Sequence, residues 1–563
     1  MHGRVKVRTT AEQEAIKKVE RAKKVGQYKA AINLVIQKRK EKVYDDELLL
    51  VSEKMVLQNP DINSVWNIRR EAFEHRQCFT NGISIIYRSQ EEYVGRLKAE
   101  LTLTENCLRE NPKSYSVWHH RCWVIDHLPE PDWKTELSLC AKCLNLDERN
   151  FHCWDYRQHL VKKAGISDAE EFEFSTTKIY NNFSNYSSWH YRSKILSKMF
   201  PDPSGELPIV ADKHKEELDL VMNATFTDPN DSSAWFYQRW LLDYSKPQPN
   251  ALWRVKITAS RGIIIFHGET FLKPADILLT KDANEVETTW SSYNDEKFSK
   301  IWTTTFPEPL DLSCLAISIK YENEEYNLVK SDDIWFYKSS HSPINKHNKA
   351  QLKEQMENYK QLNEMEPNNK WAVLTGIFLM KSYDPVGYHE KILEDLRALI
   401  KIDSLRANYY SDMRSKCIMD YELHNLWKNE SDTGINSTID LSNRELTILY
   451  NEQYFSLFEE VNLGANQLGN SLHRLGALQE CKKLSLSSNS LTSLKSFPTL
   501  SSLEVLSLRN NELTSLDEIS DLIKRHKLIK IDLRDNPLWE DSVITAELAK
   551  NNPGIEFVTD CFS

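Results

Sequence analysis

Apolar and polar positions follow three different periods along the chain. In the first region apolar residues recur every three or four positions, as at Leu137, Cys140 and Leu144, which is the spacing of an amphipathic helix. In the segments 253–258 and 315–321 they alternate with polar residues, as in half-buried strands. In the tail, leucines two positions apart precede an asparagine. The chain is therefore predicted to be mainly α-helical, with an inserted β region and a tail of short repeats.

A recurring sequence motif centred on tryptophan, which we call the tryptophan phrase, organises the first region. Five tryptophans each follow an Asn or Asp by seven residues, and four of the five follow a Ser, Asn or Asp by four residues. Their steps are 52, 36, 35 and 46 residues, and a step near 35 is typical of one helical hairpin. The tryptophans are Trp66, Trp118, Trp154, Trp189 and Trp235.

Each part of this phrase has a structural meaning. The Asn or Asp, often followed by Pro, ends one helix in a turn, and the later Ser, Asn or Asp caps the next helix by accepting a hydrogen bond from its free backbone N–H groups. An arginine three residues after the tryptophan shares its helix face. We therefore expect a superhelical stack of antiparallel helix pairs over residues 1–244. The arginines at this position are Arg69, Arg121, Arg157 and Arg192.

The β region, 245–347, is predicted to be an inserted sandwich. About six to eight short strands between turns fit a β-sandwich, and an immunoglobulin-like sandwich without a disulfide stays possible. Helical periodicity returns over 348–430, where Asn369 and Trp371 resemble a degenerate sixth copy of the phrase. The sandwich would then interrupt the helical array.

The tail, 431–563, is predicted to form a leucine-rich repeat domain. Five copies of a pattern close to LxLxxN occur in order, the first with one residue fewer before its asparagine, and the steps between their final asparagines are 23, 23, 22 and 25 residues. In such a repeat a short strand is followed by an asparagine that fixes the turn. The asparagines are Asn443, Asn466, Asn489, Asn511 and Asn536.

Composition narrows the class of function. A net charge of −10 gives no basic surface of the kind that binds nucleic acid. Ten cysteines are scattered without a disulfide framework, which favours a reducing, cytoplasmic environment. Cys140 and Cys143 form a CxxC pair, but the second pair that a zinc site needs is missing. No apolar run is long enough for a transmembrane segment.

One candidate anion site stands out. Lys113 and Arg149 lie five residues before the second and third tryptophans, and equivalent positions in stacked repeats lie side by side. Two fixed cations on one rim suit a diphosphate leaving group, although two solvated turn residues are the ordinary alternative. His152 lies in the same phrases, and the weaker candidates beside these cations are His119, His120 and Tyr156.

These phrases carry a family resemblance. The run 111–121 resembles the signature repeat of protein prenyltransferase α subunits, and 147–157 and 182–192 resemble the next two copies. The inserted sandwich and leucine-rich tail are similar to the extra domains of the Rab geranylgeranyltransferase type within that family.

The resemblance implies a transferase that is active only as a heterodimer. Such an enzyme moves geranylgeranyl from geranylgeranyl diphosphate to C-terminal cysteines of Rab GTPases that an escort protein presents. It implies a zinc ion held mainly by the β subunit, and Lys113 and Arg149 beside the diphosphate. His2 is expected to approach that zinc, and this chain contributes no certain catalytic residue.

Two alternatives stay open at the level of sequence. Helical and leucine-rich arrays commonly bind proteins without catalysis, so a scaffold is one. The other is the α subunit of farnesyltransferase or of the type I geranylgeranyltransferase, which the leucine-rich tail disfavours.

Overall fold

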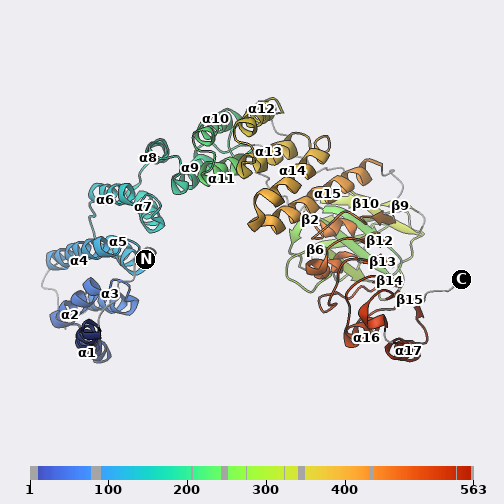
Figure 1. The fold of residues 1–563 in the computed structure, drawn as a ribbon, viewed down its shortest axis with the longest axis horizontal. Helices are drawn as coiled ribbons and strands as arrows, with labels where there is room; N and C mark the ends of the chain where they lie inside the picture. The colour runs from blue at the N-terminus through green and yellow to red at the C-terminus, as the bar shows by residue number, and fades with distance from the viewer. Residues whose placement is uncertain are drawn as a thin grey trace. The chain divides into compact units, whose positions relative to one another are not determined.

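The chain forms two compact units, Met1–Met199 and Phe200–Ser563 (Figure 1). This computed structural model describes residues 11–77, 90–203, 207–242, 252–273, 276–322, 324–331, 333–339, 349–429, 437–540 and 542–558.

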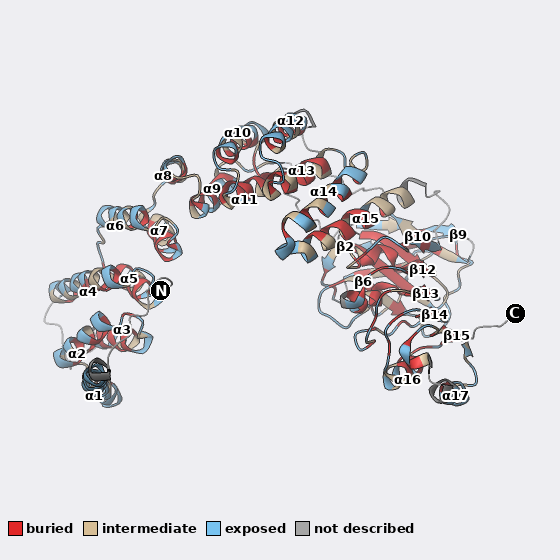
Figure 2. Ribbon diagram, in the orientation of Figure 1, coloured by how far each residue is buried: buried red, intermediate tan, exposed pale blue. Residues whose placement is uncertain are grey.

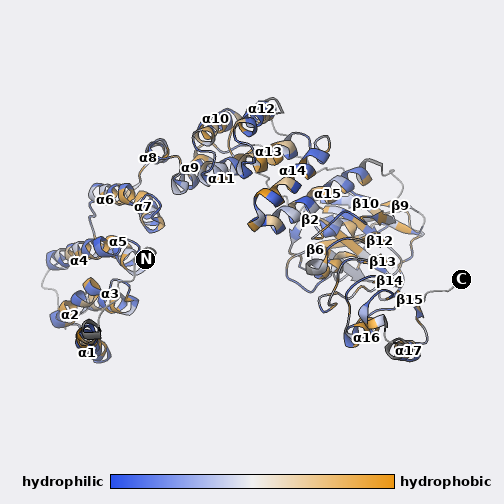
Figure 3. Ribbon diagram, in the orientation of Figure 1, coloured by the Kyte–Doolittle hydropathy of each residue, from blue (hydrophilic) through white to orange (hydrophobic). Residues whose placement is uncertain are grey.

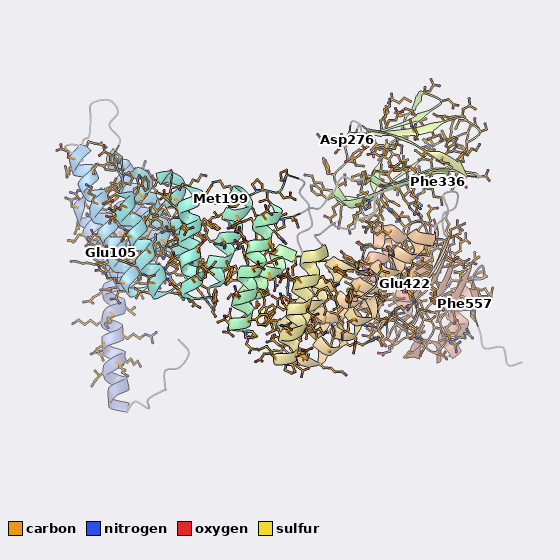
Figure 4. All side chains as sticks on the ribbon, turned by 90° about the horizontal axis from the view of Figure 1, so that it is seen from above. Glu105, Met199, Asp276, Phe336, Glu422 and Phe557 are labelled. Atoms are coloured by element: carbon orange, nitrogen blue, oxygen red, sulfur yellow. The ribbon has the colours of Figure 1, made fainter. Side chains whose placement is uncertain are left out.

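Unit 1 is built from antiparallel helix pairs. We call the first helix of each pair the outer helix and the second the inner helix. They pack on each other: α2 on α3, α4 on α5, α6 on α7 and α8 on α9. Residues 15–30 of α1 are exposed, and Figure 4 shows this half of the helix projecting away from the other helices of unit 1. The described helices are α1 (Ala11–Lys40), α2 (Asp46–Gln58), α3 (Asn63–Gln77), α4 (Gln90–Glu110), α5 (Tyr115–His127), α6 (Trp133–Leu146), α7 (Phe151–Ala164), α8 (Asp168–Asn181) and α9 (Tyr186–Met199).

The tryptophan phrase builds the turn inside each pair. The side chain of Asn111 accepts a hydrogen bond from the backbone N–H of Lys113 at 3.2 Å, which tightens the turn. The indole of Trp118 then donates to the carbonyl oxygen of Pro112, six residues earlier, at 2.8 Å. The same indole bond recurs as Trp66 to Pro60, Trp154 to Glu148, Trp189 to Phe183 and Trp235 to Pro229.

The carbonyl that receives the indole also joins neighbouring repeats. Pro60 accepts a second bond from the Ser114 hydroxyl at 3.2 Å, and Pro112 accepts one from the Asn150 amide at 2.9 Å. Asn150 also caps α7 as expected, whereas Ser114 makes no side-chain cap to α5. The expectation that Ser114 caps its helix was therefore wrong, because its hydroxyl is used between repeats.

Unit 2 contains eight further described helices, and six of them precede the tail. Asn369 caps α13 and donates to the carbonyl of Pro229 at 3.0 Å, the same contact that Asn150 makes in unit 1. Figure 2 shows buried residues on the facing sides of these helices, and Figure 3 shows hydrophobic and hydrophilic residues mixed along them. The six helices before the tail are α10 (Ala211–Thr227), α11 (Ser232–Leu242), α12 (Lys349–Met365), α13 (Lys370–Tyr383), α14 (His389–Ile402) and α15 (Ala407–Asn429), with the 3-10 turn η1 (Ser404–Arg406).

Two antiparallel sheets lie between α11 and α12 in sequence. Their orders are β5-β6-β2-β1-β10-β9 and β4-β3-β7-β8. Ten strands are described, more than expected, because strands as short as 291–292 show no alternation in sequence. They are β1 (Leu252–Ile257), β2 (Arg261–Thr270), β3 (Ile277–Lys281), β4 (Asn284–Val286), β5 (Ser291–Ser292), β6 (Ser299–Thr305), β7 (Ile317–Tyr321), β8 (Glu324–Asn327), β9 (Val329–Ser331) and β10 (Ile334–Lys338).

The larger of these sheets is covered on both faces. One face packs on the smaller sheet through Val255, Ile264 and Ile319. The other face, with Trp253 and Ile263, joins the core of the C-terminal region. Strand β1 is therefore buried at every position.

The tail forms a parallel sheet in sequential order, β11 to β16. Its register pairs equivalent positions of successive repeats, for example Leu484 with Leu506. The last strand, β16, is not part of any LxLxxN copy and was not predicted. The elements are β11 (Thr438–Asp440), η2 (Glu452–Phe455), β12 (Glu460–Asn462), η3 (Gly469–Ala477), β13 (Lys483–Ser485), β14 (Val505–Ser507), α16 (Leu516–Arg525), β15 (Lys530–Asp532), η4 (Pro537–Glu540), α17 (Ser542–Asn551) and β16 (Glu556–Phe557).

Buried asparagines hold successive turns of the tail together. The Asn511 amide donates to the carbonyls of Leu486 and Leu508 at 3.0 and 2.8 Å. Its oxygen accepts from the backbone N–H groups of Asn489 and Leu491 at 2.9 and 3.0 Å. One side chain therefore satisfies four buried backbone groups from two repeats.

We predict that Asn511→Ala lowers the free energy of unfolding of unit 2 by about 3 kcal/mol, because buried donors and acceptors lose their partners. Urea denaturation of the full chain measures this change. The matched control is Glu512→Ala, an exposed neighbour, which should change stability by less than about 0.5 kcal/mol. Equal stability of the two variants would contradict the role assigned to Asn511.

Candidate functional site

The predicted cations lie on successive turns of unit 1. Lys113 lies in the turn between α4 and α5; its ammonium is 3.0 Å from the Asp147 carboxylate and its side chain is 66% exposed. Arg149 occupies the same position in the next turn, where its backbone N–H donates to Asp147 at 3.2 Å and its guanidinium donates to the Ser184 carbonyl. Asp147 thus contacts both residues. We call Lys113, Asp147 and Arg149 the cationic rim.

Exposed aromatic residues flank the cationic rim. Tyr115, Phe151 and Tyr186 are the first residues of α5, α7 and α9, and their exposed fractions are 69%, 50% and 49%. The Tyr115 ring centroid lies 4.1 Å from that of His152 and 5.8 Å from that of Phe151. Sequence analysis did not select them, although an aromatic residue three positions before the tryptophan in three successive copies is a usable signal.

His152 packs beside this aromatic group. Burial lowers its pKa below the ordinary value, the Asp155 carboxylate opposes this, and the Lys113 ammonium adds to the lowering. We therefore expect His152 to be neutral near pH 7, so that the positive charge of the rim comes from Lys113 and Arg149.

His120 and Tyr156, in contrast, belong to the contacts between repeats. His120 is fully buried, and its ring lies 2.9 Å from the Glu100 carboxylate. Tyr156 is 1% exposed and donates to Glu136 at 2.7 Å. Glutamate contacts thus account for both side chains. His119 is exposed and lies 2.7 Å from the Arg70 guanidinium, on the side of α5 that faces α3.

The arginine of the phrase completes these contacts. Arg121 donates two bonds to Glu136, at 2.9 and 2.6 Å, and Arg157 pairs in the same way with Glu171. The arginines therefore bond a glutamate of the next outer helix. Glutamates at this position were not predicted from the sequence, although each lies 18 residues before a tryptophan; they are Glu100, Glu136, Glu171 and Glu217.

The buried pairs perturb ionisation strongly. Burial by itself raises the pKa of Glu100, but Arg69 and His120 more than offset this effect and lower it to about 2. Burial also lowers the pKa of His120, against the raising effect of Glu100. Glu100 is therefore expected to be an anion throughout the neutral range.

Neither a metal cluster nor a membrane span is found in the part of the chain that the structure describes. There, no three His, Cys, Asp or Glu residues are grouped so that they could hold a metal ion. No described helix combines the length and apolar character needed to cross a bilayer. His2, predicted to approach a zinc ion, lies outside the described residues.

The helix pairs match a known repeat. A family model described as the protein prenyltransferase alpha subunit repeat matches residues 97–128, 133–164, 168–199 and 214–245. These segments correspond to the pairs α4–α5, α6–α7, α8–α9 and α10–α11.

Relatives match along the whole chain. The Homo sapiens protein named Geranylgeranyl transferase type-2 subunit alpha is 34% identical over 99% of this chain and 100% of its own length. The chain belongs to the geranylgeranyl transferase type-2 subunit alpha family. The Saccharomyces cerevisiae member is 36% identical and covers 43% of this chain and 72% of its own length. The solved structure described as Candida albicans protein geranylgeranyltransferase-I complexed with GGPP is 16% identical, with a TM-score of 0.40, and covers 69% of this chain and 90% of its own.

We predict that Glu100→Gln lowers the free energy of unfolding of this type-2 alpha chain by about 3 kcal/mol near neutral pH. This is the free energy that corresponds to lowering the carboxyl pKa from its ordinary value to about 2 in the folded state. Because the folded pKa is lowered, this contribution is present above the ordinary carboxyl pKa and is lost as pH falls through the folded value. The difference from the wild type should therefore shrink between about pH 4.5 and about pH 2. Urea denaturation at several pH values measures it.

Glu105→Gln, on the same helix, is the matched control, because Glu105 pairs only with the exposed Arg109 in the contacts described for it. Its effect should stay below about 1 kcal/mol at every pH. A Glu100→Gln deficit that does not change with pH would show that lost packing, and not charge, causes it.

Proposed function

We propose that this chain is the α subunit of a heterodimeric Rab geranylgeranyltransferase. In this role it transfers geranylgeranyl from geranylgeranyl diphosphate to C-terminal cysteines of Rab GTPases that an escort protein presents. The observation that carries the proposal is the full-length match to relatives named as type-2 alpha subunits. We further propose that the heterodimer is cytoplasmic.

The cationic rim is proposed to bind the diphosphate. Lys113 is well exposed, and its partner Asp147 lies in a solvated turn, so the ammonium can exchange this carboxylate for a ligand oxygen at small cost. Fixed positive charge of this kind stabilises the negative charge that grows on a departing diphosphate. Arg149 supplies a second cation on the neighbouring turn.

Zinc is proposed to be held by the partner subunit. Zinc lowers the pKa of a bound thiol and so supplies a thiolate nucleophile. The described residues of this chain offer no set of ligands for it. His2 is proposed to approach this metal from outside the described residues.

The two sheet-containing regions have proposed identities as well. The paired antiparallel sheets within 245–347 are proposed to be an immunoglobulin-like sandwich. The parallel sheet of 431–563, with its buried asparagines, is proposed to be a leucine-rich repeat domain. Segments 1–244 and 348–430 are then one helical array interrupted by the sandwich.

Co-expression with a prenyltransferase β subunit tests the main proposal. We expect a stable 1:1 complex that transfers geranylgeranyl to a Rab–escort complex and is inactive when either subunit is absent. A chain that stays alone, as a scaffold would, contradicts the proposal. So does a complex that modifies a short cysteine-terminated peptide without an escort protein.

We predict that Lys113→Ala slows transfer by the heterodimer by about tenfold or more, because one cation is removed from the leaving group. Assembly and the affinity for the β subunit should stay unchanged, since Lys113 is exposed. Single-turnover transfer and analytical ultracentrifugation measure the two effects.

Lys142→Ala is the matched control, because Lys142 is exposed on α6, outside the turn that carries the cationic rim. Lys113→Arg should recover part of the rate, since it restores the charge. Unchanged transfer in Lys113→Ala would remove Lys113 from the diphosphate site.

A further inference from the structure

Three free cysteines meet between α6 and α7. Cys140 and Cys143 lie one turn apart on α6, and Cys153 is the third residue of α7. The Cys153 sulfur lies 3.5 Å from the Cys140 carbonyl oxygen, and Cys143 and Cys153 lie on either side of the turn that joins the packed helices α6 and α7. The closest approach of α6 and α7 near their turn is therefore lined by thiols.

The three thiols differ in their exposure to solvent. Cys140 and Cys153 are 0% exposed, whereas Cys143 is half-buried and reaches solvent. A small oxidant thus meets Cys143 first, and the fully buried Cys153 is reached only after it. This is the arrangement of an attacking thiol and a resolving thiol.

The environment of Cys143 also favours its thiolate. The hydrogen bond from Cys153 lowers the pKa of Cys143 to about 7, burial opposes this, and the nearby Arg121 guanidinium adds to the lowering. The same hydrogen bonds raise the pKa of Cys153. Burial raises the pKa of Cys122, in the neighbouring pair, to about 12. Thiolate character governs the rate of reaction with peroxides.

We propose that Cys143 and Cys153 form a disulfide when the protein meets a hydroperoxide. The Cys143 thiolate attacks the distal oxygen, so that the O–O bond breaks, Cys143 becomes a sulfenic acid and the alkoxide or hydroxide leaves and is protonated. The Cys153 sulfur then attacks the sulfenic sulfur; the S–S bond forms, the S–O bond breaks and the departing hydroxide takes the Cys153 proton as water. Two thiols are oxidised by two electrons and one peroxide is reduced.

The disulfide reaches the turn that carries Arg149. The backbone N–H of Cys153 donates to the Asn150 side chain at 3.3 Å, and Asn150 joins Pro112 of the preceding turn. The two sulfurs must approach to about 2.05 Å to bond, which draws the first turn of α7 toward α6. We infer that oxidation displaces Asn150 and Arg149 and slows transfer; this consequence rests on the proposed function.

Mass spectrometry of the full chain tests the thiol pair. Purified protein is treated with hydrogen peroxide, its remaining thiols are blocked with N-ethylmaleimide, and it is digested without reductant. We expect a linked peptide pair containing Cys143 and Cys153, which disappears in Cys143→Ser and persists in Cys122→Ser, a half-buried control. A bond between Cys140 and Cys153, or none, overturns the proposal.

The alkylation rate of Cys143 in the unmodified protein gives a second measurement that no folding defect of a variant affects. This rate should rise with pH through about 7, while Cys122 reacts slowly over the same range. Equal pH profiles at the two cysteines would overturn the proposed order of attack.

Transfer by the heterodimer tests the consequence. Peroxide should lower it severalfold, dithiothreitol should restore it, and Cys143→Ser should resist the treatment. Disulfide formation without a change in transfer would overturn the regulatory part. A heterodimer that is inactive before treatment would instead refute the proposed function, and the peptide analysis would stand.

Discussion

In unit 1, the outer helices α4, α6 and α8 each carry a buried glutamate that contacts side chains of the inner helices on both sides of it. Glu136 on α6 receives Arg121 from the preceding inner helix and Tyr156 from the following one. Glu171 on α8 receives Arg157 and Tyr191 in the same way. Removing one partner would leave a buried charge uncompensated, which costs about 3–5 kcal/mol. The glutamate therefore favours one register of its helix against each of the two neighbouring inner helices.

This constraint explains the form of the tryptophan phrase. The tryptophan closes its own turn, the residue two positions later bonds the glutamate of its own pair, and the arginine at the third position bonds that of the next pair. Because these positions are committed to packing, the exposed side chains of this region lie in the turn before each inner helix and at the first position of that helix. Lys113, Tyr115 and Phe151 stand there.

The sequence predicted those features whose partners are local. The turn bond spans two residues, and the recurring Asn or Asp predicted it. The indole bond spans six residues at a fixed spacing, but it was not predicted. The asparagines of the tail repeat at a nearly constant step and could be found in the same way. Ser114 shows where this logic stops. Its spacing predicted a helix cap, but its partner, Pro60, lies in another repeat. Spacing within one phrase cannot reveal such a contact.

The arrangement of the candidate site residues could likewise be predicted only in part. Lys113 and Arg149 were predicted to lie together because equivalent positions of stacked repeats fall on one rim, and Asp147 contacts both; their role toward a diphosphate stays a prediction. His120 and Tyr156 were grouped with them because a sequence shows neighbours along the chain and not the direction of a side chain. In the structure both side chains are buried against a glutamate between helices.

The sheet regions of unit 2 depend on a contact that no periodicity encodes. Glu480 in the tail pairs with Lys256 and Arg261 of the larger sheet, at 2.9 and 3.3 Å, and Trp253 packs on Tyr454 with ring centroids 4.5 Å apart. Alternation predicted that β1 is a strand, but not that its second face is covered. Deleting the tail would expose that apolar face to water, at a cost of about 25 cal/mol for each Å². Truncation of the tail would therefore also destabilise the antiparallel sheets that pack on it. Substitutions of exposed residues are better suited to testing the sheets and the tail separately.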